Sequence, residues 1–247
     1  MMELMVAMAL GGFIAIVTAL SFRNAVKVFT SNSGSDAAMR DLVKVRRTLE
    51  QELPLASVAP SRMQIGNAPA SLGGGADGSY VNFLSAINST TGEMELINDG
   101  SGNPWFFENI FYYVTVPQNH DAMYGVSCTG GNEGGFDYNC PHKLLLRGVA
   151  DQNPATSPKD STTEDSLLPV MDSSVLVRPT GFPKGVALRT VGANLLTFQV
   201  QRNGAELLID LRAVSLVEAK REVPVGTYSF RTGRYTIEHR FSVFPRN

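Results

Sequence analysis

One acidic residue, Glu3, lies at the edge of an apolar segment, where a charged side chain is energetically unfavourable. Glu3 precedes residues 4–22, LMVAMALGGFIAIVTALSF, an uncharged apolar run that Arg23 closes. A charged carboxylate at the centre of a membrane helix costs about 2.5–3.5 kcal/mol and costs less near the interface, so such a group usually has a partner. We therefore expect Glu3 to pair with a positive group. The alternative is an interfacial acid that is exposed to water among the lipid headgroups.

The two cysteines are the next residues that could do chemistry. Cys128 and Cys140 are the only cysteines, and they bracket CTGGNEGGFDYNC, a loop rich in glycine and polar residues. His120 and His142 are isolated in the sequence and His239 is remote, so we expect no zinc set. We expect a disulfide, which implies an oxidising compartment and contributes about 3 kcal/mol on the chain-entropy model. Two free thiols are the alternative.

Some oxygen-bearing side chains are spaced as they would be in a calcium loop. Asp99, Ser101 and Asn103 occupy alternate positions, as the first ligands of an EF-hand loop do. However, Pro104 occupies the position where an EF-hand needs glycine, and Ile110 occupies the position of the bidentate glutamate. We therefore expect a glycine-rich surface turn in this part of the chain.

Two further polar segments give weaker signals. Asp160, Glu164 and Asp165 could contribute to a cation site, but the polar stretch Asp151–Ser166 predicts an exposed, solvated loop. Asn88-Ser89-Thr90 matches the glycosylation sequon, and nothing in the sequence establishes machinery to use it.

Catalytic signatures are missing from the sequence. It contains no G-x-S-x-G elbow, no P-loop, no H-E-x-x-H and no dinucleotide fingerprint, so we expect neither an enzyme nor a cofactor. The formal net charge of −2 gives no basic field for general nucleic-acid binding.

The apolar run that follows Glu3 predicts a membrane helix. About 19 apolar residues suffice to cross a hydrocarbon core. The run has neither the basic start nor the small-residue cleavage site of a signal peptide, so a signal anchor is favoured. Small residues recur along it, and such a stripe lets another helix approach closely. The residues expected to pack in this way are Ala7, Gly11, Gly12, Ala15 and Ala19.

The helical pattern continues beyond the membrane segment. Ser31–Gly34 should weaken the helix, with Ser35 or Asp36 capping a restart, and Pro54 should end it. An apolar stripe then predicts an amphipathic second half, formed by Met39, Leu42, Val45, Leu49 and Leu53. We therefore divide the chain into a membrane helix over 1–30, an amphipathic helix over 31–54 and a head over 55–247.

Alternating apolar residues and turn signals dominate the head. They predict strands over Tyr80–Ala86, Phe106–Val116, Lys143–Val149, Val175–Arg178, Gly185–Thr190, Leu195–Arg202, Glu206–Val217, Thr227–Arg231 and Thr236–Phe244. Asn203-Gly204 is the strongest hairpin turn signal. The expected fold class is α+β, with a long N-terminal helix packed on an antiparallel sheet.

The N-terminal segment resembles the type IV pilin and pseudopilin superfamily. Members carry a processed N-terminus that reads roughly F-T-L-x-E-L-M-V-x-x-A-x-x-G, and residues 1–12 are MMELMVAMALGG. Glu3 lies two residues after Met1, whereas the family glutamate lies four residues after the processed N-terminus. We therefore expect a precursor that begins upstream with a leader and a cleavage glycine. The C-terminal half, with GANLLTFQVQ and HRFSVFPRN, resembles PilW-type minor pilins and the J-type pseudopilin of type II secretion.

The resemblance implies a structural role in a filament. It implies that Glu3 pairs with the N-terminal amine of a neighbouring subunit and sets the axial register. The implied partners are other pilins, the inner membrane, an assembly platform and a prepilin peptidase, and the head would be periplasmic or exposed on a filament. A filament-tip adhesin or DNA-uptake pilin with an unknown ligand is the first alternative. A membrane-anchored envelope enzyme is the second.

Overall fold

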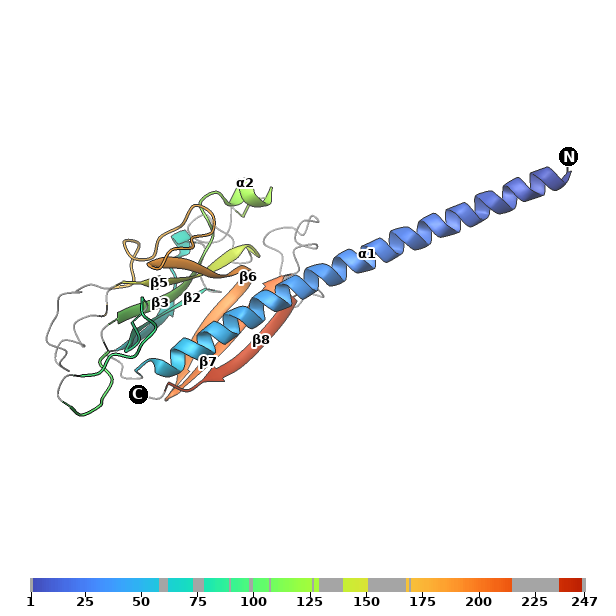
Figure 1. Ribbon diagram of the computed structural model, residues 1–247. Coiled ribbons are helices and arrows are strands. Elements are labelled where there is room, and N and C mark those ends of the chain that lie inside the picture. Colours follow the sequence, from blue (N-terminus) through green and yellow to red (C-terminus); the bar gives the residue numbers. More distant parts are fainter. Residues whose placement is uncertain are drawn as a thin grey trace.

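A computed structural model describes most of the helix and the sheet. It covers residues 2–57, 62–72, 78–88, 90–97, 100–106, 108–125, 127–128, 140–150, 168, 170–214 and 236–245. The side chains of Glu3, Leu4, Ala7, Ser31 and Ala70 are not part of this description. The chain folds as one long helix that projects from a seven-stranded antiparallel sheet (Figure 1). This arrangement confirms the α+β class.

The long helix α1 runs without interruption from Met2 to Glu52. The expected break at Ser31–Gly34 is therefore wrong. Among the helix residues whose burial is described, Gly34 is the first that is buried. Burial therefore begins at the glycine that local propensity marks as a weak point. The helix ends as expected, because Pro54 lies in the short 3₁₀ helix η1 (Leu53–Leu55) that follows it.

The C-terminal half of α1 buries an apolar stripe against the sheet. Leu42, Val45, Leu49 and Leu53 are fully buried, as the sequence pattern predicts. Met39 does not belong to the stripe, because its side chain is 42% exposed, and Ala38 is buried in its place. A spacing of four residues puts Ala38, and not Met39, on the face of Leu42.

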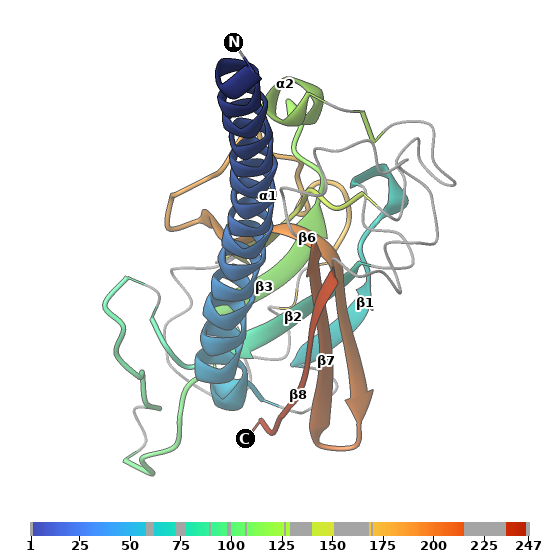
Figure 2. The ribbon, with the colours of Figure 1, turned by 90° about the vertical axis from the view of Figure 1, so that its right-hand side faces the viewer.

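The described strands form a meander, in which each strand pairs with the described strands that come before and after it in the chain. The order is β1-β2-β3-β5-β6-β7-β8, and all of the pairs are antiparallel. α1 packs against β6, β7 and β8, and Figure 2 shows the helix in front of the sheet with β7 and β8 beside it. The strands are β1 (Met63–Asn67), β2 (Ser79–Ser85), β3 (Glu108–Thr115), β5 (Lys143–Val149), β6 (Leu188–Asn203), β7 (Glu206–Val214) and β8 (Thr236–Val243).

The centre of the sheet is buried on both faces. Ile110, Tyr112 and Val114 of β3 point into the core that contains the helix stripe. Phe111 and Tyr113 point the other way, into a second cluster. Its other buried members are Leu72, Leu144, Leu146, Met171 and Leu176. A layer of connecting segments thus covers the face opposite α1, so β3 has apolar residues at successive positions.

The predicted strands are confirmed at β2, β3, β5, β7 and β8, within a few residues. The two strands expected between Gly185 and Arg202 form one strand, β6, and β1 was not predicted. Val175–Arg178 is not a strand. The predicted strand Thr227–Arg231 lies outside the described residues. The expected hairpin joins β6 to β7 through Gly204, whose φ of 64° requires the left-handed region.

Two short elements complete the description. The 3₁₀ helix η2 (Ala70–Leu72) precedes β2, and the short helix α2 (His120–Tyr124) follows β3. α2 ends at Gly125, whose φ of 71° provides a left-handed C-cap.

Candidate assembly interface and a buried histidine–cysteine cluster

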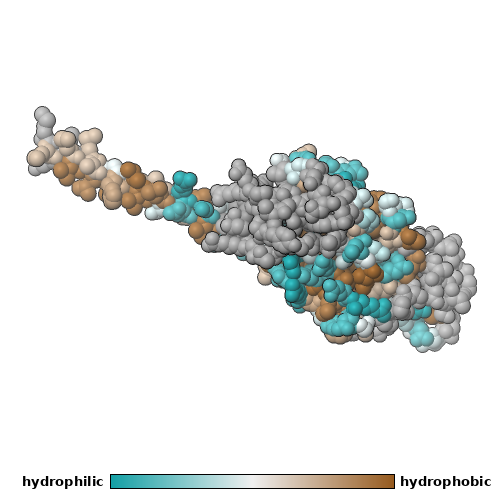
Figure 3. All heavy atoms as spheres, turned by 180° about the vertical axis from the view of Figure 1, so that it is seen from behind, coloured by the Kyte–Doolittle hydropathy of each residue, from teal (hydrophilic) through white to brown (hydrophobic). Residues whose placement is uncertain are grey.

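The N-terminal half of α1 is an exposed apolar rod. Between Met2 and Phe29 the helix spans roughly 40 Å at 1.5 Å per residue. Its large apolar side chains are exposed, with Phe13 at 66% and Phe29 at 73%. Figure 3 shows this rod as a mostly hydrophobic stalk that leads away from the head. Among the described residues, α1 alone is long and apolar enough to cross a membrane.

The small residues of the rod are open to contact. Gly11, Gly12, Ala15 and Ala19 are all exposed. A Cβ atom added at Gly11 or Gly12 would have no other atom within 4 Å. The side chains of Glu3 and Ala7 lie outside the described residues, although both residues belong to α1. The stripe is therefore available to a partner helix along the part that is described.

The last turn of α1 is fixed to the sheet by a carboxylate. Glu52 accepts hydrogen bonds from Arg147 Nε at 2.8 and 3.0 Å, from the Tyr112 hydroxyl at 2.5 Å and from Arg189 Nη2 at 3.2 Å. These three partners come from β5, β3 and β6. One helix residue thus bridges three strands.

The surroundings of Glu52 explain why this contact holds. An acid at a helix C-terminus is disfavoured by the helix dipole, and the two guanidinium groups reverse that effect. Arg147 is nearly buried, with 6% of its side chain exposed, so the pair is shielded from water. Burial and the adjacent Glu52 carboxylate raise the pKa of Tyr112, which therefore stays neutral and donates its proton.

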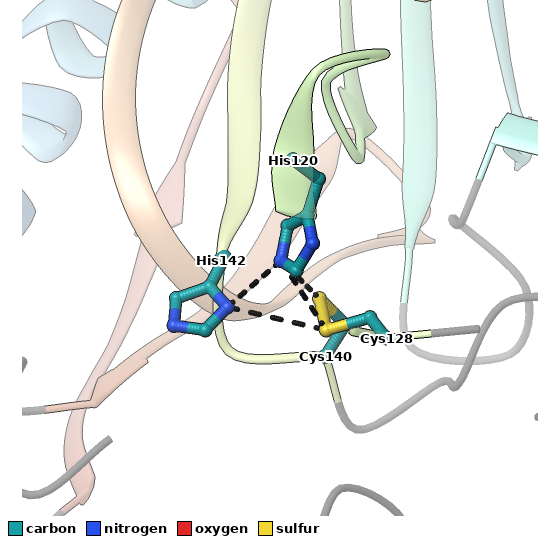
Figure 4. A group of neighbouring side chains, drawn as sticks. All are labelled: His120, Cys128, Cys140 and His142. Carbon is teal, nitrogen blue, oxygen red and sulfur yellow. Dashed lines mark hydrogen bonds between the residues drawn. A yellow bond between two sulfur atoms is a disulfide. The ribbon is translucent and has the colours of Figure 1, made fainter. Parts of the chain in front are cut away.

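The region of the two cysteines differs from the sequence-based expectation. Cys128 and Cys140 form the expected disulfide. His120 and His142, however, are not isolated: His120 Nε2 lies 2.9 Å from His142 Nδ1. Their ring nitrogens also lie 3.4–3.9 Å from the sulfur atoms (Figure 4). The expectation that the two histidines lie apart is therefore wrong. The fold places the start of α2, which carries His120, beside His142, the residue directly before β5.

All four of these residues are buried, and their donor atoms lie within 4.8 Å of one another. Two neighbours hold the rings in place. His120 Nδ1 lies 2.8 Å from Asp121 Oδ1, and the Tyr124 ring stacks on His142 with ring centroids 4.0 Å apart. Two imidazoles and two sulfur atoms make up the donor set of a Cys₂His₂ metal site. Sequence reasoning missed this set because the two histidines lie 22 residues apart.

The other candidate sites are local turns where they are described. Ser101 Oγ accepts a hydrogen bond from Asn103 N, and Gly100 and Gly102 have positive φ. This matches the expected glycine-rich turn, although Asp99 lies outside the described residues. Asp160, Glu164 and Asp165 lie outside them as well.

The sequon also forms a turn. Asn88 Oδ1 accepts hydrogen bonds from the backbone N–H groups of Thr90 and Thr91, so the side chain that a glycan would modify is held against the backbone. Ser89 lies outside the described residues.

Comparisons with known proteins do not assign the chain to a family. No protein-family model, no curated protein and no solved structure matches it significantly.

Proposed function

We propose that this protein is a structural minor pilin or pseudopilin. It primes or caps a type IV pilus or type II secretion filament through its N-terminal helix. The observation that carries the proposal is that one uninterrupted helix serves two environments. Its first half is an exposed apolar rod, and its second half is the buried spine of the head. Such a helix couples a membrane-embedded contact rigidly to a globular domain.

Assembly would depend on the exposed half of α1. The stripe of Gly11, Ala15 and Ala19 permits a close approach of helix backbones in lipid, where packing rather than the hydrophobic effect drives association. Glu3 would then pair with the N-terminal amine of a neighbouring subunit. Because an unpaired carboxylate is penalised in a low-dielectric bundle, the pair would favour one axial register.

The proposed location is a single-pass anchor in the inner membrane, with the head in the periplasm or on the filament. The disulfide between Cys128 and Cys140 supports an oxidising compartment for the head. The proposed partners are other pilins, an assembly platform and a prepilin peptidase, with the work of assembly done by a cytoplasmic ATPase.

The alternative roles draw less support from the described head. Phe111, Tyr112 and Tyr113 are buried and Trp105 is only 8% exposed, so these aromatic side chains form core and not an adhesive edge. A hollow of about 510 Å³ lies along β6, β7 and β8. Its charged lining residues pair with one another, Asp210 with Arg212 at 2.9 Å and with Arg240 at 3.4 Å.

Replacing Glu3 tests the proposed role. In cells that assemble the filament, Glu3→Ala and Glu3→Val should leave membrane insertion intact, because both remove a charge from an apolar segment. The amount of the chain recovered in sheared filaments should fall by tenfold or more, because the register pair is worth at least about 1.4 kcal/mol in the bundle. Insertion is measured by carbonate extraction and incorporation by immunoblotting.

Glu50→Ala provides the matched control. Glu50 is an exposed acid on the same helix and pairs only with exposed Arg46, at 2.8 Å, among the contacts described for it. This variant should be incorporated normally. If the two Glu3 variants are also incorporated normally, the proposed role of Glu3 is wrong.

A further inference from the structure

Three N···S distances in the histidine–cysteine cluster are close to those around a tetrahedral ion. With zinc bond lengths of about 2.3 Å to sulfur and 2.0–2.1 Å to nitrogen, a tetrahedron has N···S edges of about 3.6 Å. The observed N···S distances are 3.4 Å (His120 to Cys128), 3.7 Å (His120 to Cys140) and 3.9 Å (His142 to Cys128). We propose that His120, Cys128, Cys140 and His142 bind Zn²⁺ when the two cysteines are thiols.

The orientation of His120 supports the proposal independently of these distances. Its Nδ1 faces the Asp121 carboxylate at 2.8 Å, and its Nε2 faces His142 and both sulfur atoms. A carboxylate on one ring nitrogen fixes the tautomer that leaves the other nitrogen free to bind a metal. Asp121 is therefore a positioning residue for a zinc ligand.

The surroundings of the cluster favour a structural metal. All four residues are nearly or fully buried, and the Tyr124 ring covers His142. Four protein ligands fill a tetrahedral zinc shell and leave no open position for substrate. Two thiolates balance the charge of Zn²⁺, and the two imidazoles remain neutral. The site would therefore join α2 to Cys128 and to the residues just before β5.

The zinc site and the disulfide exclude each other. Opening the disulfide takes two electrons and two protons from a dithiol, which becomes a disulfide in turn. Zinc binding then releases the two thiol protons to water. In the reverse direction, the two thiolates give their two electrons to the disulfide of a thiol–disulfide oxidoreductase, and Zn²⁺ leaves. The sulfur atoms must move apart to roughly 3.8 Å, the S···S edge of a tetrahedral site with Zn–S bonds of about 2.3 Å.

Cobalt binding by the reduced full-length chain tests the proposal. The protein is purified in detergent, reduced with a phosphine without oxygen and titrated with Co²⁺ alone. We expect one Co²⁺ per chain, with the visible bands of tetrahedral cobalt and thiolate charge-transfer absorption. Zn²⁺ should displace the cobalt, and the oxidised chain should bind neither ion at this site.

Variants separate this site from other ways of holding a metal. His120→Ala and His142→Ala should each lower the affinity for Co²⁺ at least tenfold. His239→Ala should leave it unchanged, because His239 lies on β8, three strands away from β5 in the sheet. Asp121→Asn should weaken binding by about 10–100-fold while the tetrahedral spectrum remains. Circular dichroism of each oxidised variant, in which the disulfide closes the loop without metal, shows that the head is folded.

Two results would overturn the proposal. The first is a reduced, folded chain that binds no stoichiometric Co²⁺. The second is binding that survives replacement of both His120 and His142, which would assign the metal to the cysteines alone. Neither result bears on the filament role, which is tested at Glu3.

Discussion

Val45 of α1 packs directly against Gly192 of β6. A Cβ atom added to Gly192 would lie 2.3 Å from Val45 Cγ2, which is well inside van der Waals contact. Gly192 lies in β6 and has no positive φ that would call for glycine, so the close approach of Val45 is the reason for the glycine here. The missing side chain lets α1 lie against the strand.

Gly192→Ala should therefore destabilise the head. The added methyl group meets a fully buried valine, and overpacking of this kind costs about 1–3 kcal/mol. The free energy of unfolding is measured by urea denaturation of the full chain in detergent. Gly185→Ala is the control, because the nearest atom to its added Cβ is at 3.4 Å, and it should change stability by less than about 0.5 kcal/mol.

A double-mutant cycle between Gly192 and Val45 tests whether their contact causes the destabilisation. Val45→Ala removes the group that clashes, so Gly192→Ala should cost at least 0.5 kcal/mol less in that background, an interaction energy of the size that contacting residues show. Additive effects of the two substitutions would contradict the proposed contact.

Glu52→Gln should loosen the end of α1 from the sheet. The substitution removes the negative charge from the ion pair with the nearly buried Arg147, and hydrogen bonds to charged groups contribute about 1.5–3 kcal/mol. We expect a loss of that size in the free energy of unfolding. Glu50→Gln alters only an exposed pair with Arg46 and should cost less than about 0.5 kcal/mol. Equal effects of the two variants would show that the bridge from Glu52 does not stabilise the head.

Tyr113 should make the protein sensitive to alkali. Burial raises its pKa far above 10, and its hydroxyl donates to the Val177 carbonyl at 2.6 Å. Since the folded state holds this proton more tightly than the unfolded state, the stabilisation is complete below pH 10. It is lost as the pH rises further, by up to about 1.4 kcal/mol per pH unit for one proton.

Tyr113→Phe should make the free energy of unfolding fall less steeply above pH 10. At pH 7 the loss of the hydrogen bond should cost about 0.5–1.5 kcal/mol. Urea denaturation at a series of pH values measures both effects. An unchanged slope in the variant would show that Tyr113 does not hold its proton more tightly in the folded state.

Removing the disulfide should weaken the head but not abolish its fold. Cys128→Ser with Cys140→Ser opens a loop whose ends are 12 residues apart, and loss of such a crosslink costs about 2–4 kcal/mol. The variant should still fold, because the large core between α1 and the sheet does not include the two cysteines. Thermal unfolding measured by circular dichroism checks both statements, and a variant without a cooperative transition would contradict the second.

Sequence periodicity predicts the parts of this fold that face water on one side. Along β7 buried residues alternate with more exposed ones, and along β8 half-buried residues alternate with exposed ones; both strands were predicted. The failures arise where tertiary contact decides the structure. The helix continues through Ser31–Gly34, and its burial begins at Gly34. β6 passes through Gly192, because Val45 fills the space beside it. β1 is short, contains Gly66 and becomes a strand by pairing with β2.

The candidate sites also divide into those that the sequence pattern predicts and those that depend on tertiary contact. The exposed apolar rod follows from composition alone, and so does the disulfide once two cysteines bracket a short loop. The approach of His120 to His142 does not, because it depends on how α2 returns to the start of β5. Spacing along the chain carries no signal for a contact of that kind.

The meander order of the sheet has a consequence for how this protein can diverge. Each described strand pairs with the described strands before and after it in the chain, so a connection can gain residues without rerouting any of them. The closure entropy of a flexible loop rises by only about 0.6 kcal/mol for each doubling of its length. Flexible connections between these strands can therefore accept insertions at little thermodynamic cost. The outer surface of the head can therefore change in evolution while α1 and its contacts with the sheet stay the same.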